Sequence, residues 1–424
     1  MKNFWDKISL IWNDKGLRNR VFFVLGMLVV FRFVSNIPIP GVDALKLRQL
    51  FNDNQLLGML SVFSGGGLHN LSVVMLGVGP YITASIIMQL LTMIFPSMKE
   101  MYQEEGQAGR RKFAQYSRIL SVPLAMLQAF GFLALLQKQG VVVAGLGTLG
   151  QVTNVFIITA GSVLLMWIGE LINEYGIGNG VSLIIFSGIV SRIPTTASQL
   201  FYQFDLSQIP LYLAFLVVAV VIIAAVVVIT EAERPIPVTY AKRVRGLKVY
   251  GGTSTYLPLR LNQAGVIPII FALSILLFPQ MIVGFLSTVN NAIIAKIAGV
   301  LTSIINNQLI YGGVYFLLVI LFTYFYTAVT FDPDQIADNL QKGGAFIPGV
   351  RPGNPTSEHI GKIITRLTLF GSVFLGLVAV LPLLMKAVSG NNSLAIGGTA
   401  LLIVVSVIIE LMKQVDAQVS MREY

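Results

Sequence analysis

Cysteine is absent from this chain of 424 residues, histidine occurs only twice, and charged residues make up only 11% of the sequence. The lack of cysteine excludes disulfides and thiolate metal sites. A chain with 55% hydrophobic residues and so few charges has more apolar surface than the core of a soluble domain can hold. The sequence therefore predicts an integral membrane protein.

Ten apolar segments approach the length needed to cross a hydrocarbon layer about 30 Å thick. They lack the strict alternation of barrel strands, which predicts helices. The approximate segments are 21–38, 71–95, 119–136, 152–172, 181–191, 209–230, 264–286, 311–331, 363–384 and 394–412. The fifth is short and has to include neighbouring residues to span. The predicted fold class is thus an all-α membrane protein with ten transmembrane helices.

Lysine and arginine are unevenly distributed between the two sides of this arrangement. With a cytoplasmic N-terminus, the inner segments hold 22 of the 29 basic residues and the outer loops hold 6. This excess predicts that both chain ends are cytoplasmic. Residues 1–20 have no cleavable apolar core, so they are expected to form an amphipathic segment at the membrane surface or a simple flank that fixes topology. Residues 413–424 are expected to form a short cytoplasmic tail.

Two sequence patterns occur once in each half of the chain. The sequence GVGPYITASI at 77–86 recurs as GVIPIIFALS at 265–274, and GVSLII at 180–185 recurs as GTALLI at 398–403. Interrupted apolar segments at matching places in two halves indicate an inverted repeat, with the functional path at the repeat interface. The predicted halves are residues 21–205, with spans one to five, and 206–412, with spans six to ten.

Isoleucines occupy equivalent positions of these repeats: Ile82 with Ile270, and Ile185 with Ile403. Equivalent positions near an axis in the membrane plane converge at mid-bilayer, which would place the four side chains in one apolar collar. Val78 and Val181 lie four residues earlier on two of the same helix faces. Such a collar excludes ions because it does not wet. The alternative for each residue is ordinary contact with lipid or a packed neighbour.

The loop between spans one and two contains an apolar stretch, residues 56–70, that is too short to cross a bilayer. Gly65 to Gly67 provides a hinge because glycine adopts unusual backbone angles without strain. This stretch is a candidate plug for a pore. Its alternative is a loop that rests on the outer surface.

Two long basic loops are expected on the cytoplasmic side, at 231–262 and 332–362. The first carries Lys242, Arg243, Arg245 and Lys248, and the second has a proline- and glycine-rich tip that presents Arg351. In the first loop, Val238 and Tyr240 are expected to pair with Val249 and Tyr250 as a short hairpin. Rigid basic loops are suited to an acidic partner such as RNA phosphate or protein carboxylates. The alternative is that membrane topology alone accounts for the charge.

Three polar residues, Thr83, Gln128 and Asn262, lie in or at the edge of the second, third and seventh spans. They are expected to hydrogen-bond across a helix seam, at about 0.6 to 2 kcal/mol per contact, or to make ordinary interhelical contacts.

Enzymatic motifs are missing from the sequence, which lacks a nucleophile with its base, a metal-ligand set and a phosphate-binding loop. His69 and His359 fall in loops on opposite sides of the membrane, and the glycine-rich stretch 176–180 follows no strand and has no lysine. We therefore expect no catalytic residue and no cofactor. Ionisable residues within the spans, which usually mark ion paths, are limited to Arg32, Glu170 and Glu410 near span ends, which argues against an ion-coupled carrier.

The sequence from Val21 to Met412 resembles the SecY family, the channel subunits of the bacterial protein translocase. The motifs that carry the resemblance are GPYITASII at 79–87, GIGNG at 176–180, YAKR at 240–243, LPLRLN at 257–262 and GAFIPGVRPG at 344–353. The resemblance implies ten helices in two pseudo-symmetric inverted halves around a central hourglass pore. The sequence departs from the family pattern at Val78 and Val181, where the resemblance implies isoleucine in the collar.

The resemblance also implies a role for each candidate residue. The pore ring would be Val78, Ile82, Val181, Ile185, Ile270 and Ile403. The plug would be Leu57, Gly58, Met59, Leu60, Ser61, Val62, Phe63, Ser64, Gly65, Gly66 and Gly67. The lateral gate, between spans two, three, seven and eight, would contain Thr83, Gln128 and Asn262. The motor or ribosome contact would involve Lys242, Arg243, Arg245, Lys248 and Arg351.

The resemblance further implies SecE and SecG as subunits and SecA or the ribosome as the partner that drives transport. RNA contact would occur only through the ribosome. The substrates would be secretory and membrane proteins, and membrane lipids would surround the channel in the bacterial cytoplasmic membrane. Two other functions fit the residue pattern: an uncoupled carrier, which would saturate with a small solute, and a membrane scaffold, which would tolerate loss of the collar.

Overall fold

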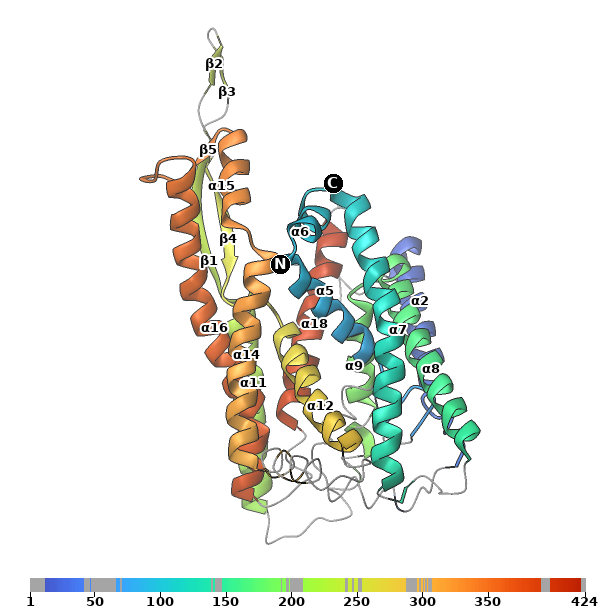
Figure 1. Ribbon diagram of the computed structural model, residues 1–424. Coiled ribbons are helices and arrows are strands. Elements are labelled where there is room, and N and C mark those ends of the chain that lie inside the picture. The colour runs from blue at the N-terminus through green and yellow to red at the C-terminus, as the bar shows by residue number, and fades with distance from the viewer. Residues whose placement is uncertain are drawn as a thin grey trace.

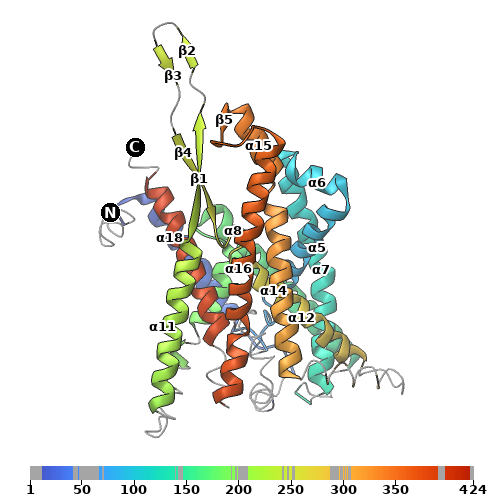
Figure 2. The same ribbon diagram turned by 90° about the vertical axis from the view of Figure 1, so that its left-hand side faces the viewer.

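The computed structural model describes most of the chain. The described residues are 12–41, 46, 66–68, 71–138, 140–141, 147–191, 193–195, 198, 209–240, 243–245, 248–250, 254–286, 296, 299, 301, 303, 307–389 and 397–420. They form a bundle of helices from which a narrow β-hairpin projects at one end (Figures 1 and 2).

Ten helices coincide with the ten expected spans. They are α2 (Lys15–Val34), α5 (Gly79–Ile94), α7 (Gly106–Lys138), α8 (Thr148–Tyr175), α9 (Gly180–Val190), α11 (Ile209–Glu231), α12 (Ile267–Leu286), α14 (Gln308–Thr330), α16 (Asn354–Ser389) and α18 (Gly397–Ser420). Two shorter helices, α6 (Pro96–Gln103) and α15 (Pro333–Lys342), lie at the end of the bundle from which the hairpin projects (Figures 1 and 2).

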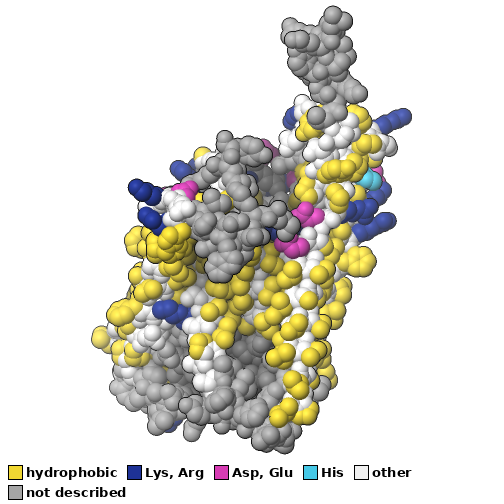
Figure 3. All heavy atoms as spheres, turned by 180° about the vertical axis from the view of Figure 1, so that it is seen from behind, with side chains coloured by type: hydrophobic (Ala, Val, Ile, Leu, Met, Phe, Trp, Pro, Cys, Tyr) yellow, Lys and Arg dark blue, Asp and Glu magenta, His cyan; other side chains and the backbone are white. Residues whose placement is uncertain are grey.

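Several of these helices are shorter than a full membrane crossing. By length and composition alone, four helices among the described residues could span a membrane, or five when α5 and α6 are counted as one span with a bend of 116°. The short helix α9 has 11 residues and α5 has 16. Side chains exposed on α11 and α14 are large and apolar, as expected for helices facing lipid. The described part of one face is accordingly covered with hydrophobic side chains, and Lys and Arg gather toward the hairpin end (Figure 3).

The two basic loops join in one three-stranded antiparallel sheet with the order β4-β1-β5. The strands are β1 (Glu233–Tyr240), β4 (Ser254–Arg260) and β5 (Ala345–Phe346). Strand β5 comes from the second loop and pairs with the end of β1. The sheet therefore fixes the base of the first loop to the second.

The expected pairing of Val238 with the residues around Val249 is wrong. Val238 pairs with Thr255 on β4, while a separate hairpin of β2 (Arg243–Arg245) and β3 (Lys248–Tyr250) forms the projecting tip. The physical reason is burial: Ile236 and Val238 alternate along β1 and pack in one cluster with Leu259 of β4. A shifted register would turn these side chains toward water.

Ile236 provides a test of this sheet, because it is 3% exposed in the cluster beneath the strands. We expect Ile236→Ala to destabilise the sheet by about 2 to 5 kcal/mol, since it leaves a cavity in a packed core. Limited proteolysis of the purified protein should then cut the region of β1 and β4 faster. Tyr256→Ala on β4 is the matched control, because Tyr256 is 66% exposed. Equal cleavage of both variants would contradict the packing described here.

Candidate functional site

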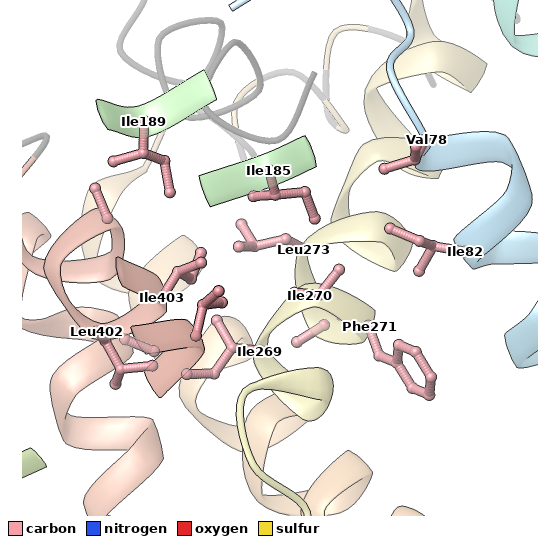
Figure 4. Packing of buried hydrophobic residues seen from close by; sticks show 14 of the residues in the cluster. Val78, Ile82, Ile185, Ile189, Ile269, Ile270, Phe271, Leu273, Leu402 and Ile403 are labelled. Carbon is pink, nitrogen blue, oxygen red and sulfur yellow. The ribbon is translucent and has the colours of Figure 1, made fainter. Parts of the chain in front are cut away.

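The expected collar residues come together inside the bundle. Val78, Ile82, Ile185, Ile270 and Ile403 are all buried in one hydrophobic cluster, and the half-buried Val181 packs against that cluster. Figure 4 shows the five buried side chains directed toward a common region; they come from α5 with its N-cap Val78, and from α9, α12 and α18. This burial excludes contact with lipid for the five buried residues. Ordinary packing against a neighbour, the other alternative, fits the same burial, and the ring role stays a prediction.

Matching backbone turns at the start of α5 and α12 position the first isoleucine pair. Gly77 and Gly265 both have φ of +61°, a conformation that glycine adopts without a side-chain clash. A proline follows three residues later in each repeat, at Pro80 and Pro268, near the first helical position, where its missing N–H leaves no partner unsatisfied. The two helices thus begin in the same way and present Ile82 and Ile270 at equivalent places.

The position of Ile185, one member of the second isoleucine pair, depends on how α9 begins. The Gly180 N–H donates to Asn173 Oδ1 at 2.7 Å, and the Ser182 N–H donates to Asn179 Oδ1 at 3.2 Å. A Cβ atom at Gly180 would lie 2.0 Å from the Gly169 carbonyl oxygen of α8, so only glycine permits this approach of α9. These contacts hold the short helix that carries Ile185 against α8.

Sequence reasoning missed several members of the apolar cluster, among them Ile189 and Leu273. Ile189 lies one turn after Ile185 on α9, and Leu273 lies three residues after Ile270 on α12. Both side chains lie beside the expected ring residues (Figure 4). Each of these residues lies three or four positions after a ring residue on the same helix, and this spacing could have predicted its place beside the ring. The cluster is therefore thicker than one layer of side chains.

The three expected gate residues are buried: Thr83 lies on α5, Gln128 on α7, and Asn262 in the segment between β4 and α12. Helix α12 contacts both α5 and α7. Thr83 Oγ1 donates to the Gly79 carbonyl of its own helix at 3.0 Å, and Asn262 Nδ2 donates to the Gly265 carbonyl at 3.2 Å. Gln128 is 7% exposed on α7. The hydrogen bonds of Thr83 and Asn262 thus stay within their own segments, and the gate role remains a prediction.

The side-chain amide of Asn262 is only half satisfied. Its Oδ1 atom is buried and has no hydrogen-bond partner among the described residues. A buried acceptor without a partner costs about 1 to 3 kcal/mol. Asn262 therefore carries an unfilled acceptor in the segment between β4 and α12, beside Gly371 of α16.

Most of the expected plug, Leu57 to Gly65, lies outside the described residues, as does Lys242. Gly66 has φ of +87°, and a Cβ atom at Gly67 would lie 2.8 Å from the Val74 carbonyl oxygen. The backbones of Arg243, Arg245 and Lys248 form the projecting hairpin. Exposed Arg351 lies between Gly349 and Gly353, whose φ angles of +84° and +94° make the tight turns of that tip.

Comparisons with known proteins agree with this geometry. The family model described as SecY matches residues 72–412. The protein translocase subunit SecY of Mycobacterium bovis is 42% identical, over 96% of this chain and 96% of its own length.

Solved structures share the fold. One, described as the structure of a protein conducting channel, has a TM-score of 0.65 and 20% identity, with 95% of this chain and 92% of that chain covered. Another, the channel in a canine ribosome-channel complex from the endoplasmic reticulum, has a TM-score of 0.63 and 18% identity, with 96% and 93% covered. With a family model that matches residues 72–412 and a relative that is 42% identical over 96% of the chain, the chain belongs to the SecY family, a family of multi-pass membrane proteins that act as channels and not as enzymes.

Proposed function

We propose that the protein is a passive channel that passes unfolded secretory proteins across the bacterial cytoplasmic membrane and releases apolar segments sideways into the lipid. The observation that carries this proposal is the convergence of isoleucines from four helices into one buried apolar cluster. Membership in the SecY family supports it, because the curated relative at 42% identity is a protein translocase subunit.

The collar provides the seal in this proposal. Branched alkyl side chains do not wet, so the closed ring blocks ions, and they offer no hydrogen bonds that a passing chain would have to satisfy. Val78 and Val181 lack one methylene each relative to isoleucine. The side chains of Ile189 and Leu273, which are buried in the same cluster, would add apolar volume beside the ring.

The lateral gate would open along the seam that α5 and α7 make with α12 and α14. Helix α12 packs on α5, α7 and α14, so its displacement would part the two halves, residues 21–205 and 206–412. The buried Oδ1 of Asn262, which has no hydrogen-bond partner among the described residues, would accept a hydrogen bond during opening. Residues 56–70 would plug the outer side of the collar.

Energy for transport would come from a partner, because the sequence has no nucleotide-binding motif. SecA or the ribosome would bind the two basic loops, and SecE and SecG would complete the complex. The canine structural neighbour comes from a ribosome-channel complex, which supports the proposed ribosome contact. RNA contact would then occur only through the ribosome. Both termini and both basic loops would be cytoplasmic, following the excess of lysine and arginine.

Site-specific crosslinking tests the proposed function. A photoreactive residue is placed singly at Ile82, Ile185, Ile270 or Ile403, and a secretory precursor is stalled in the reconstituted complex. We expect all four positions to crosslink to the precursor. Val217 on α11 is the control, because it is 58% exposed on the lipid-facing side and should crosslink to lipid only. Crosslinking at Val217 but at none of the four isoleucines would overturn the proposal.

A further inference from the structure

A charged side chain lies between helices close to the collar. Arg32 is in the last turn of α2, yet its guanidinium turns toward α9 instead of the bundle surface. Its Nε atom donates to Ser187 Oγ at 3.3 Å, and its Nη2 atom donates to the Ser187 backbone carbonyl. The guanidinium carbon lies 4.9 Å from the centroid of the Phe31 ring. Arg32 therefore joins α2 to α9 by a two-point contact.

The acceptor is in the last turn of α9, two residues after Ile185. The same Ser187 carbonyl also accepts the Ser191 N–H at 3.1 Å, which closes the end of the helix. Carbonyls at a helix C-terminus carry partial negative charge, so a guanidinium there is favourable. The short helix that carries Ile185 is thus held near Gly180 by α8 and at its other end by Arg32.

Arg32 also contacts the turn that leads toward Val78. A Cβ atom at Gly66 would lie 3.6 Å from Arg32 Nη1 and 4.0 Å from the Gly188 carbonyl oxygen, so Gly66 packs between the arginine and α9. The next residue, Gly67, accepts hydrogen bonds from the Ser72 N–H and Oγ at 3.0 and 3.1 Å. Through Arg32, one end of α9 and the start of the Gly66–Val78 segment share a single anchoring point.

Burying an arginine between these helices costs more free energy than burying an apolar residue there. Charged side chains within membrane-spanning helices are expensive, and they occur where they pair inside the bundle or serve a function. A leucine would pack α2 against α9 without that cost. What leucine cannot supply is a pair of N–H donors for the end of α9.

We infer that Arg32 is a positioning residue that holds Ile185 and Val78 in the closed collar and thereby sets how apolar a signal segment has to be to open the channel. This inference rests on the proposed function. Weakening the anchor would destabilise the closed state relative to the open state, so weaker signals would suffice for opening. The anchor acts on the collar through α9 and the Gly66–Val78 segment and does not itself contact the passing chain.

Three variants test the inference. Arg32→Gln removes the charge and the fork, Arg32→Lys retains the charge without the fork, and Ser187→Ala removes one acceptor while leaving the backbone carbonyl. Arg118→Gln is the matched control, because Arg118 is also a partly exposed arginine that joins two helices of the first half, through an ion pair of 2.5 Å with Glu170. Its ion pair joins α7 to α8 and, among the described residues, involves neither Ser187 nor Gly66.

The measurement is export into vesicles of a precursor with its full signal sequence and of the same precursor with a weakened signal. We expect Arg32→Gln to raise the weak-to-full export ratio roughly tenfold, because hydrogen bonds to a charged group are among the stronger ones. Ser187→Ala and Arg32→Lys should give smaller rises, and Arg118→Gln should keep the wild-type ratio. A purely structural role would instead reduce export of both precursors together.

The outcomes separate this inference from the proposed function. Failure of the wild-type complex to export the full-signal precursor would overturn the proposed function. Normal wild-type export with an unchanged ratio in Arg32→Gln would overturn the role of Arg32. If Arg32→Gln does not accumulate in the membrane, Ser187→Ala and Arg32→Lys decide the matter, and unchanged ratios in both would overturn it.

Discussion

Replacing Ile270 or Ile403 with asparagine is expected to make the closed channel leak ions and accept weak signal sequences. Both residues are buried in the apolar cluster, with Ile270 8% exposed and Ile403 1% exposed. An amide in this position attracts water into a region that otherwise does not wet. It also leaves a buried polar group without a partner, which costs the closed state about 1 to 3 kcal/mol. That cost corresponds to a rise of roughly 5- to 150-fold in the open population.

Ion flux through the reconstituted channel, measured without a precursor, checks this expectation. Ile222→Asn is the matched control, because Ile222 on α11 is 7% exposed in the same hydrophobic cluster but is not one of the ring residues. It suffers the same burial of an amide, so it should lower stability without a leak. Ile270→Val should remain tight, because it keeps a branched alkyl group. Wild-type tightness in both asparagine ring variants would remove the collar from the mechanism.

Reversing the charge of Arg351 to glutamate is expected to reduce motor-driven export at least roughly tenfold, since charge complementarity governs association with an acidic partner surface. Arg351 is exposed on the tip between Gly349 and Gly353. The backbone carbonyl of Arg351 accepts the hydroxyl of Thr356 at 2.8 Å, so the turn itself is held independently of the guanidinium. A surface substitution of this kind should change folding stability by no more than about 0.5 kcal/mol.

Lys342→Glu makes the same change of charge in the same loop and serves as the control. Lys342 is exposed in the last turn of α15 and lies outside the Arg351 tip. Export driven by SecA, binding of ribosomes and the yield of folded protein are measured for both variants. Equal loss in the two variants would mean that the total charge of the loop matters and that Arg351 has no special place. Unchanged export in Arg351→Glu would contradict the proposed contact.

The sequence by itself determined the membrane class, the helical spans and the pairing of the collar positions. These features are local or periodic: apolar segments of sufficient length have to satisfy their backbone as helices, and the repeated glycine and proline at 77–80 and 265–268 mark equivalent helix starts. The repeat therefore predicted that Ile82 and Ile270 occupy equivalent places before any contact was known. It also predicted the matching pair on α9 and α18.

Only the tertiary structure decided which segments distant in sequence meet. Arg32 and Ser187 are 155 positions apart, and nothing in either local pattern indicates their contact. The register of β1 with β4 likewise follows from the shared burial of Ile236, Val238 and Leu259 against α16, which neither strand encodes alone. Packing selects among the arrangements that local patterns permit, because each buried polar group needs a partner and each apolar face needs cover.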